Sequence, residues 1–510
     1  RRARRHPHRD PGDGPAHPGK ALTQRKHTDP GPPSQIREGG PGSFCPLEER
    51  EWEQGRGEFG EKAQNGGSST PDLHRPLPNC SEFQENNRKP LAILQVGAYN
   101  MPCVIRQKED NIDMKELSKI ALAVEPSSTM AIDTLFKQMK AEGQDVIGFG
   151  AGEPDFNTPE PIKDAAKKAI DENYSRYSPV AGYPALRNAI VAKLKNENGL
   201  EYTANQISCA NGAKQSVCNT IMVLVNPGDE VIIPAPFWVR YPEMVKLAEG
   251  TPVIVAAGIE QDFKITPAQL EAAITPKTKA LILCSPSNPT GSVYSAEELA
   301  GLAEVLKKHP EIIVIADEIY EHINYIGKHN SIAQVDGMKD RTVIVNGVSK
   351  AYAMTGWRIG FIAGPEWIVK AVNKLQGQYT SGPCSVSQKA AEAAYTGSQT
   401  PVEEMRQAFE RRRNLIVGLA KEIPGFEVNQ PEGAFYLFPK CSYYFGKTDG
   451  TRTIENADDL AMYLLEVAHV ACVGGTSFGA PECIRMSYAT SDENIVEAIK
   501  RIKEALAALK

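Results

Sequence analysis

The sequence predicts an α/β fold in which a large domain has a mostly parallel sheet covered by helices on both faces, and a smaller α+β domain accompanies it. Three observations support this prediction. Continuous apolar runs of strand length recur from residue 145 onward, with segments that have one apolar helical face between them. Toward the C-terminus, the strand-like runs GAFYLFP and CIRMSYAT precede a final amphipathic helix. The 510 residues, 41% of them apolar, are enough for roughly two to four domains.

The expected strands of the large sheet follow one another along the chain. They are DVIGFG (145–150), DEVIIP (229–234), TPVIVA (251–256), KALILC (279–284), EIIVIA (311–316), TVIVNG (342–347) and RIGFIAG (358–364). A representative helix lies in 158–173, where we expect Thr158 as the N-cap and Pro159 in the first turn. The expected apolar faces are Ile162, Ala165, Ala166, Ala169 and Ile170 in this helix, and Ile495, Ile499, Ile502 and Leu506 in the last one.

Composition divides the chain into four segments. Residues 1–113 are rich in Arg, Pro, Gly and charge, which predicts a disordered or non-native extension, with Met114 as a natural beginning. We expect 114–160 to form an N-terminal arm and part of the small domain. We expect 161–389 to form the large cofactor-binding domain and 390–510 the small C-terminal domain.

Charge and composition narrow the class of function. The formal net charge of -6 gives no reason to expect nucleic acid or an anionic membrane as a partner, so small molecules are the expected ligands. No apolar run reaches the roughly 18 residues that span a bilayer, and no signal-peptide pattern opens the chain. The 10 cysteines are scattered without metal-ligand spacing. We expect a soluble cytoplasmic protein without a metal; an organelle such as the plastid is the alternative if the extension is an address.

Polar side chains follow four of the predicted strands, where the strands end. KALILC leads to Asn288, EIIVIA to Asp317 and Tyr320, TVIVNG to Ser349, Lys350 and Arg358, and DEVIIP to Trp238. Ligands of open α/β sheets bind beyond the carboxyl ends of the strands, so we expect these side chains to line one site. Taken singly, Asp317 and Lys350 are compatible with a structural ion pair. The combination favours a functional site.

The chemistry of this set matches one cofactor. The amine of Lys350 can form a Schiff base with an aldehyde when its pKa is lowered. A pyridine ring works as an electron sink while its nitrogen stays protonated, which requires a carboxylate such as that of Asp317. Arg358, the Ser349 hydroxyl and the backbone of NGAKQ (211–215) suit a phosphate, and Trp238 suits stacking on a flat ring. The set predicts pyridoxal 5'-phosphate.

The motifs SKAYAMTGWRIG, CSPSNPTGSVY, ADEIYEH, AGEPDF and IRMSYATS resemble the class-I aminotransferases of fold type I. The resemblance is to the prokaryotic-type aspartate aminotransferase branch, which also contains prephenate aminotransferases, and it covers the chain from Lys115 to the C-terminus. It implies reversible transamination by a ping-pong mechanism, in a homodimer with shared active sites. Aminotransferases for aromatic or other amino acids are the alternative within this reading.

The resemblance also implies roles for individual residues. Lys350 would bind the cofactor covalently and move the proton of the substrate carbon, Asp317 would pair with the ring nitrogen, and Tyr320 and Asn288 would bind the ring oxygen. The phosphate would be held by Arg358, Ser349 and the turn Gly212, Ala213 and Lys214, with Tyr177 reaching the phosphate of the neighbouring subunit. Arg485 would bind the substrate α-carboxylate, with Gly152, Trp238 and Asn288 lining the same substrate site.

Substrate choice is also read from the resemblance. The distal carboxylate of aspartate or glutamate would meet Lys214, Ser127 and Thr129. This set occurs in members that use prephenate and in aspartate-specific members, so it allows prephenate without requiring it. Arg240 stands in WVRYPEM where the family often has serine.

Short motifs also suggest three other classes of protein: a hydrolase, a nicotinamide-dependent dehydrogenase and a transcription regulator. GTSFG (475–479) matches a hydrolase nucleophile motif, which requires a strand before it and a helix after it. GFGAG (148–152) has the wrong spacing for a dinucleotide-binding loop. The basic start RRARRHPHR allows a transcription regulator with an aminotransferase-like sensor domain, but the first hundred or so residues contain no helix-turn-helix pattern.

Overall fold

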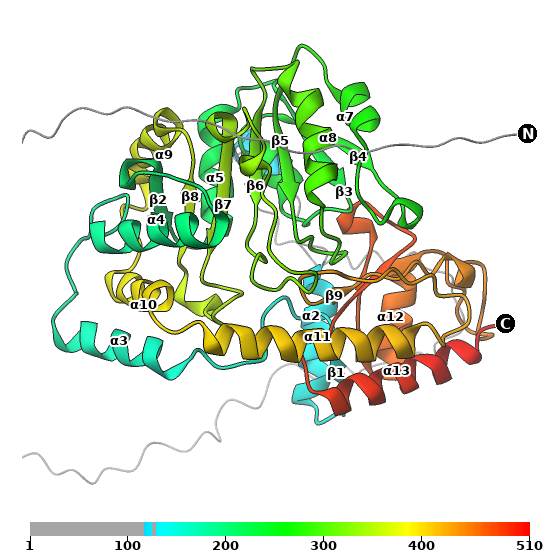
Figure 1. Ribbon diagram of the computed structural model, residues 1–510. Helices are drawn as coiled ribbons and strands as arrows, with labels where there is room; N and C mark the ends of the chain where they lie inside the picture. Colours follow the sequence, from blue (N-terminus) through cyan, green and yellow to red (C-terminus); the bar gives the residue numbers. More distant parts are fainter. Residues whose placement is uncertain (1–116, 125–128) are drawn as a thin grey trace, which may run out of the picture. The chain divides into compact units, whose positions relative to one another are not determined.

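The computed structural model describes residues 117–124 and 129–510, and the predicted extension 1–113 and Ser127 lie outside the described residues. Within this part, a seven-stranded sheet has the order β2-β8-β7-β6-β5-β3-β4 (Figure 1). Its strands are β2 (Ile207–Ala210), β3 (Glu230–Ala235), β4 (Thr251–Ala256), β5 (Thr278–Cys284), β6 (Ile313–Asp317), β7 (Thr342–Gly347) and β8 (Gly360–Ala363). All neighbours are parallel except that β8 is antiparallel to both β7 and β2, which confirms a mostly parallel sheet.

Helices cover both faces of this sheet because alternate strand residues are apolar in both directions. On one face, α5 (Ala213–Leu224), α6 (Tyr241–Leu247) and α9 (Glu366–Tyr379) pack on residues such as Ile233 and Ile315. On the other face, α7 (Pro267–Ala273) and α8 (Ala296–Lys307) pack on Leu281 and Val314. The same face is continued by α4 (Pro184–Asn198) and α10 (Ser385–Thr396), which contact β2, β7 and β8.

A second group of elements comes from the two ends of the described chain. A three-stranded antiparallel sheet has the order β11-β12-β9, and a separate parallel pair joins β1 to β10. These strands are β1 (Ile147–Gly148), β9 (Tyr436–Leu437), β10 (Val470–Ala471), β11 (Val473–Gly474) and β12 (Ile484–Ser487). The helices of this group are α2 (Thr129–Ala141), α11 (Thr400–Ala420), α12 (Ala457–Ala468) and α13 (Asp492–Ala507), whereas the short helix α1 (Lys119–Ala123) contacts α6.

The last helix has the predicted apolar stripe. Ile495, Ile499, Ile502 and Leu506 are all buried. They join one core with residues of α11 and α12, and Figure 1 shows α11 and α13 lying alongside each other. Burial of this stripe holds β9 and β12 in place, and these strands carry part of the site described below.

Three details of the predicted elements were wrong. DVIGFG contributes β1, which pairs with β10 and not with the large sheet, because its apolar residues pack into the core around α11 and α13. The helix α3 (Glu160–Asp171) has Pro159 as its N-cap, and the Thr158 hydroxyl instead donates to the Ala353 carbonyl at 2.7 Å. Ile170 is 62% exposed, because α3 packs on α10 through its other side.

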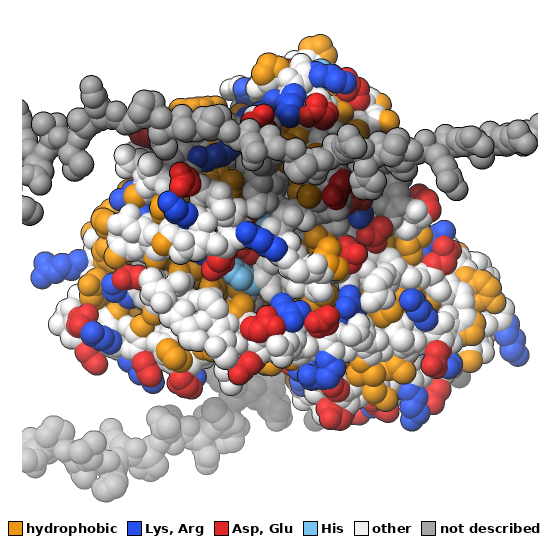
Figure 2. Space-filling model, in the orientation of Figure 1, with side chains coloured by type: hydrophobic (Ala, Val, Ile, Leu, Met, Phe, Trp, Pro, Cys, Tyr) orange, Lys and Arg blue, Asp and Glu red, His pale blue; other side chains and the backbone are white. Residues whose placement is uncertain are grey.

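In the face shown in Figure 2, basic and acidic side chains are interspersed. In the described part of the chain, none of the helices combines the length and apolar character needed to cross a membrane.

Candidate functional site

The carboxyl ends of β5, β6 and β7 bring most of the predicted site residues together. Asp317 is the last residue of β6, and its neighbours in the sheet are Cys284 at the end of β5 and Val345 in β7. Asn288 follows β5, and Ser349 and Lys350 follow β7. Parallel strands place their carboxyl ends at one edge, so the chain needs no further element to collect these groups.

Asp317 is a buried carboxylate with one strong hydrogen-bond donor. The Tyr241 hydroxyl donates to its Oδ2 at 2.6 Å, and the Ile319 backbone N–H reaches Oδ1 at 3.4 Å. Burial raises the pKa of Asp317 to about 6, although the hydrogen bond from Tyr241 acts to lower it. A cationic partner at this carboxylate would therefore be stabilised strongly.

Lys350 has the properties of a reactive amine. Its Nζ donates to the Gly152 carbonyl and lies 5.8 Å from the ring centre of Tyr320 and 5.9 Å from that of Phe435. Burial lowers the pKa of Lys350 to about 8, assisted by the charges of Arg485 and Arg358 and opposed by those of Glu153 and Asp317. A larger share of the amine is therefore neutral near pH 8 than in an ordinary lysine.

Tyr320 is paired with a second tyrosine that the sequence did not indicate. The hydroxyls of Tyr320 and Tyr436 lie 2.8 Å apart, and both side chains are buried. Tyr436 comes from β9, so it links the turn after β6 to the small sheet. A Cβ on Gly152 would stand 3.4 Å from the Tyr436 hydroxyl, which places the AGEPDF segment against the same group.

Arg485 reaches the site from β12. Its Nη1 donates to Asn288 Oδ1 at 3.0 Å and its Nη2 to the Gly150 carbonyl at 2.9 Å, while its buried Nε has no hydrogen-bond partner among the described residues. The guanidinium lies 4.7 Å from the ring centre of Tyr436 and 4.9 Å from that of Phe478. Such an arginine is oriented by its surroundings and still has capacity to bind a carboxylate.

The start of α5 forms a cradle for an anion. Gly212 is the N-cap with φ +86°, and a Cβ there would lie 2.2 Å from Arg358 Nη2. Arg358 donates to the Thr355 and Asn211 carbonyls at 2.8 and 3.1 Å and remains exposed. Ser349 is buried beside Lys350. Free N–H groups, the helix dipole and a guanidinium together favour a phosphate.

Lys214 and Trp238 meet on the side of the site next to this cradle. Lys214 Nζ lies 5.5 Å from the ring centre of Trp238, which contacts the Tyr241 ring edge-on with centres 5.3 Å apart. Partial burial lowers the pKa of Lys214, with further contributions from Arg240 and Arg358. The Arg240 charge therefore adds to the positive potential around Lys214.

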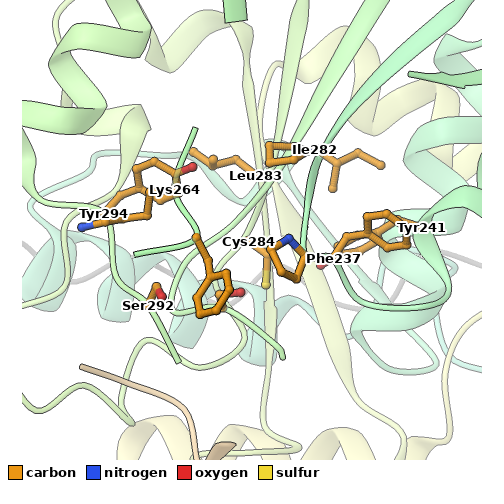
Figure 3. A pocket seen from close by; sticks show the side chains of 12 residues that line it. Phe237, Tyr241, Lys264, Ile282, Leu283, Cys284, Ser292 and Tyr294 are labelled. Atoms are coloured by element: carbon orange, nitrogen blue, oxygen red, sulfur yellow. The ribbon is translucent and has the colours of Figure 1, made fainter. Parts of the chain in front are cut away.

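A small cavity lies beside Tyr241 and Cys284 (Figure 3). It measures about 20 Å³, room for about one water, and Tyr241 and Cys284 are among its lining residues. It is too small for a substrate. Tyr241, the donor to Asp317, is itself only 2% exposed and belongs to the core between the large sheet and α5, α6 and α9.

The structure does not bring every predicted residue to this place. The side chain of Tyr177 is 97% exposed, and no side-chain position is described for Thr129.

The two competing motifs lack the structure that they require. GTSFG forms a short 3₁₀ helix between β11 and β12, unlike a nucleophile turn, and GFGAG opens no helix because the next one begins at Glu160. Tyr241 and Tyr436 were missed, and no spacing rule in the sequence points to either.

These features define the class of the protein. The chain belongs to the aminotransferase class I and II family, whose model matches residues 144–502. It is 49% identical over 441 residues to the bifunctional aspartate aminotransferase and glutamate/aspartate-prephenate aminotransferase of Petunia hybrida, covering 85% of this chain and 91% of that one. It is also 49% identical to the aspartate/prephenate aminotransferase of Cereibacter sphaeroides, covering 78% and 100% of the two chains.

Solved structures show the same fold. An aspartate aminotransferase from Rhizobium meliloti matches with a TM-score of 0.75 and 44% identity, covering 78% of this chain and 100% of that one. The aspartate aminotransferase from Thermus thermophilus with maleate matches with a TM-score of 0.71 and 40% identity, covering 76% and 99%. The fold is therefore fold type I, as the resemblance of the motifs implied.

Proposed function

We propose that this protein is a pyridoxal 5'-phosphate-dependent aminotransferase that moves an amino group between aspartate or glutamate and a 2-oxo acid, with prephenate as a further acceptor. The observation that carries the proposal is the meeting of an amine with a lowered pKa, Lys350, and a buried carboxylate, Asp317, at one sheet edge. The names of the relatives at 49% identity support the choice of substrates.

The residues fit the cofactor. Arg358, Ser349 and the N-terminus of α5 would hold its phosphate, since Gly212 leaves room that a Cβ would fill. Asp317 would keep a proton on the ring nitrogen, because a buried carboxylate gains most from a cationic partner. When bound, the pyridine ring supplies a sink for the electrons left on a carbon that loses its proton.

The remaining groups act on the substrate. The Lys350 amine would take the proton from the α-carbon of the amino acid and deliver it to the former aldehyde carbon of the cofactor, C4'. Arg485 would bind the α-carboxylate, since its Nε has no partner and its other nitrogens are already oriented. Lys214 would bind the distal carboxylate, together with Ser127 and Thr129. The structural neighbour described with maleate, a dicarboxylate, supports this class of ligand.

We further propose a homodimer in the cytoplasm. Tyr177 is 97% exposed on its own chain, as expected of a side chain that reaches the phosphate site of a second copy. The site would then be shared between two subunits, and the partners of the protein would be small molecules only.

A half-reaction screen tests the proposed function. Protein loaded with the cofactor is mixed with single amino acids, and the aminated form is then mixed with oxaloacetate, 2-oxoglutarate or prephenate, with absorbance as the readout. Aspartate and glutamate should convert the absorbance band, and each oxo acid should restore it. Lys350→Ala should lack both the original band and the response. Absence of conversion with every donor would contradict the proposal.

A further inference from the structure

A second cluster of charges lies beside the site and has no part in the proposed reaction so far. The turn after β6 carries Asp317 and Tyr320 toward the site residues, and it also carries two glutamates, Glu318 and Glu321. Both glutamates are buried, with 3% and 6% exposure. Their carboxylates contact a different set of residues from those of the site.

Glu318 accepts a hydrogen bond from a serine of the following loop and lies at ion-pair distance from a histidine, whose ring nitrogens are buried without a hydrogen-bond partner among the described residues. The Ser331 hydroxyl donates to Glu318 Oε1 at 2.5 Å, and His329 Nε2 lies 3.2 Å from Oε2. His329 is 6% exposed. The Glu318 backbone N–H donates to the Val345 carbonyl of β7 at 2.9 Å, so the pair is attached to the sheet at the level of Asp317.

Glu321 is held by a lysine and two amides. Lys193 donates to its Oε1, Asn198 Nδ2 lies 2.9 Å from Oε2, and Asn346 Nδ2 lies 2.8 Å from Oε1. The Lys193 ammonium also donates to Asn198 Oδ1 at 2.8 Å. Burial opposes ionisation of Glu321, but the charges of Lys193, His322 and His329 hold its pKa well below the usual range.

A proton on His329 places a positive charge directly against Glu318, 3.2 Å from its Oε2. Atoms of Glu318, Glu321 and His329 lie within 4.8 Å of one another. The Lys193 ammonium is shared between Glu321 and Glu197, which lies 3.5 Å from it and 2.9 Å from His322 Nε2, so Lys193 does not supply a charge to Glu318. Burial lowers the pKa of His329, but the charges of Glu318 and Glu321 outweigh it and raise the pKa above 6.5, with Lys193 opposing.

Glu318 is the connection between this cluster and the site. The negative charge of Glu318 raises the pKa of the adjacent Asp317, in addition to the larger effect of burial. The hydrogen bond from Tyr241 and the charge of Lys350 lower that pKa. A cation at His329 cancels the Glu318 charge. We propose that His329 is a positioning residue for the proposed reaction: its imidazolium neutralises Glu318 and so keeps Asp317 available as the carboxylate that faces the cofactor nitrogen. This inference rests on the proposed function.

Two single variants, His329→Gln and Glu318→Gln, and their combination test the inference. It requires the two single variants to shift the pH dependence of cofactor binding in opposite directions. The full-length protein is equilibrated with pyridoxal 5'-phosphate over a pH series, and the pH at half-maximal retention is measured by absorbance after dialysis. His329→Gln leaves Glu318 unbalanced and should move this midpoint upward by about one pH unit. Glu318→Gln leaves the His329 cation, which Glu321 still favours, without its partner and should move the midpoint downward. The double variant should return close to the unchanged protein.

A merely structural role gives a different pattern. It would move both single variants in one direction, or neither, and either result overturns the inference. Ser331→Ala is the matched control, since it removes a hydrogen bond from Glu318 without changing a charge and should leave the midpoint in place. If His329→Gln does not fold, the comparison of Glu318→Gln with the double variant tests the inference. The midpoint should then shift downward in Glu318→Gln and not in the double variant. Failure of the unchanged protein to bind the cofactor at any pH would instead refute the proposed function.

Discussion

The hydroxyl of Tyr241 and the carboxylate of Asp317 meet at 2.6 Å, although the two residues belong to different elements, α6 and β6. Among the described residues, the contact supplies the one side-chain hydrogen bond to the Asp317 carboxylate, which the proposed cofactor requires. It also fixes the start of α6 against the sheet edge, one turn after Trp238.

Tyr241→Phe should weaken cofactor binding most at low pH. Without the hydroxyl, the pKa of Asp317 should rise above about 6, because the hydrogen bond that lowers it is gone. Retention of the cofactor at pH 6.5 should fall about tenfold, equivalent to one hydrogen bond to a charged group. Tyr294→Phe is the control, since Tyr294 lines the same cavity but binds the Ile265 N–H. Equal losses in both variants would contradict the prediction.

Asp317→Asn should stabilise the cofactor-free protein while it abolishes transamination. A carboxyl whose pKa is raised from 3.8 to about 6 contributes stability below pH 4, which is lost as the pH rises through 6. Urea unfolding at pH 8 should therefore show a gain of up to about 3 kcal/mol for the variant, and little gain at pH 4. Asp164→Asn, at an exposed position, should change neither value. A variant that is less stable at pH 8 would refute the argument.

Covalent capture of the cofactor should follow the titration of Lys350. With a pKa of about 8, the neutral amine increases about tenfold per pH unit up to pH 8 and then levels off. The rate of borohydride-fixed incorporation into cofactor-free protein should show this plateau. Lys350→Arg should show no specific incorporation. A rate that still climbs between pH 9 and 10 would mean that Lys350 behaves as an exposed lysine.

Gly212→Ala should disrupt the phosphate cradle. The new Cβ would lie 2.2 Å from Arg358 Nη2 and displace the guanidinium, so the cofactor dissociation constant should rise at least about tenfold. Gly228→Ala separates this effect from backbone strain, since Gly228 has the same φ of +86° with no atom within 4 Å of its Cβ. Both variants should lose about 1 kcal/mol of stability, but only the first should lose affinity.

The sequence grouped the residues at the strand ends more reliably than it placed individual elements. Long β-strands rich in Val, Ile and Leu were recognisable from the sequence. The polar residues that follow them could therefore be grouped into one site from the sequence alone. The strand β2 was missed because ISCA is short and contains Ser and Cys. β1 was assigned to the wrong sheet, because apolar alternation reports burial and not the pairing partner.

Contacts between distant segments were beyond the sequence for a physical reason. Tyr436 reaches Tyr320 across 116 positions, and a tyrosine in GAFYLFP looks like any core aromatic until β9 and β6 are placed. The role of Glu318 was hidden in the same way, because its partner His329 shows no distinguishing pattern in IGKHNSIA. Propensity and periodicity describe neighbours along the chain, and these pairs depend on the folded arrangement.

Arg485 stands on β12, whereas Asp317 ends β6 of the large sheet and Lys350 follows β7. The residue proposed to bind the α-carboxylate is therefore encoded separately from those proposed to hold the cofactor. Exchange of the C-terminal portion between relatives should change how the α-carboxylate is held, and should leave the proposed cofactor site and Lys214, the proposed ligand of the distal carboxylate, as they are. Because β1 and α2 join the group of elements around β12 from the opposite end of the described chain, exchange of the whole group would need two junctions.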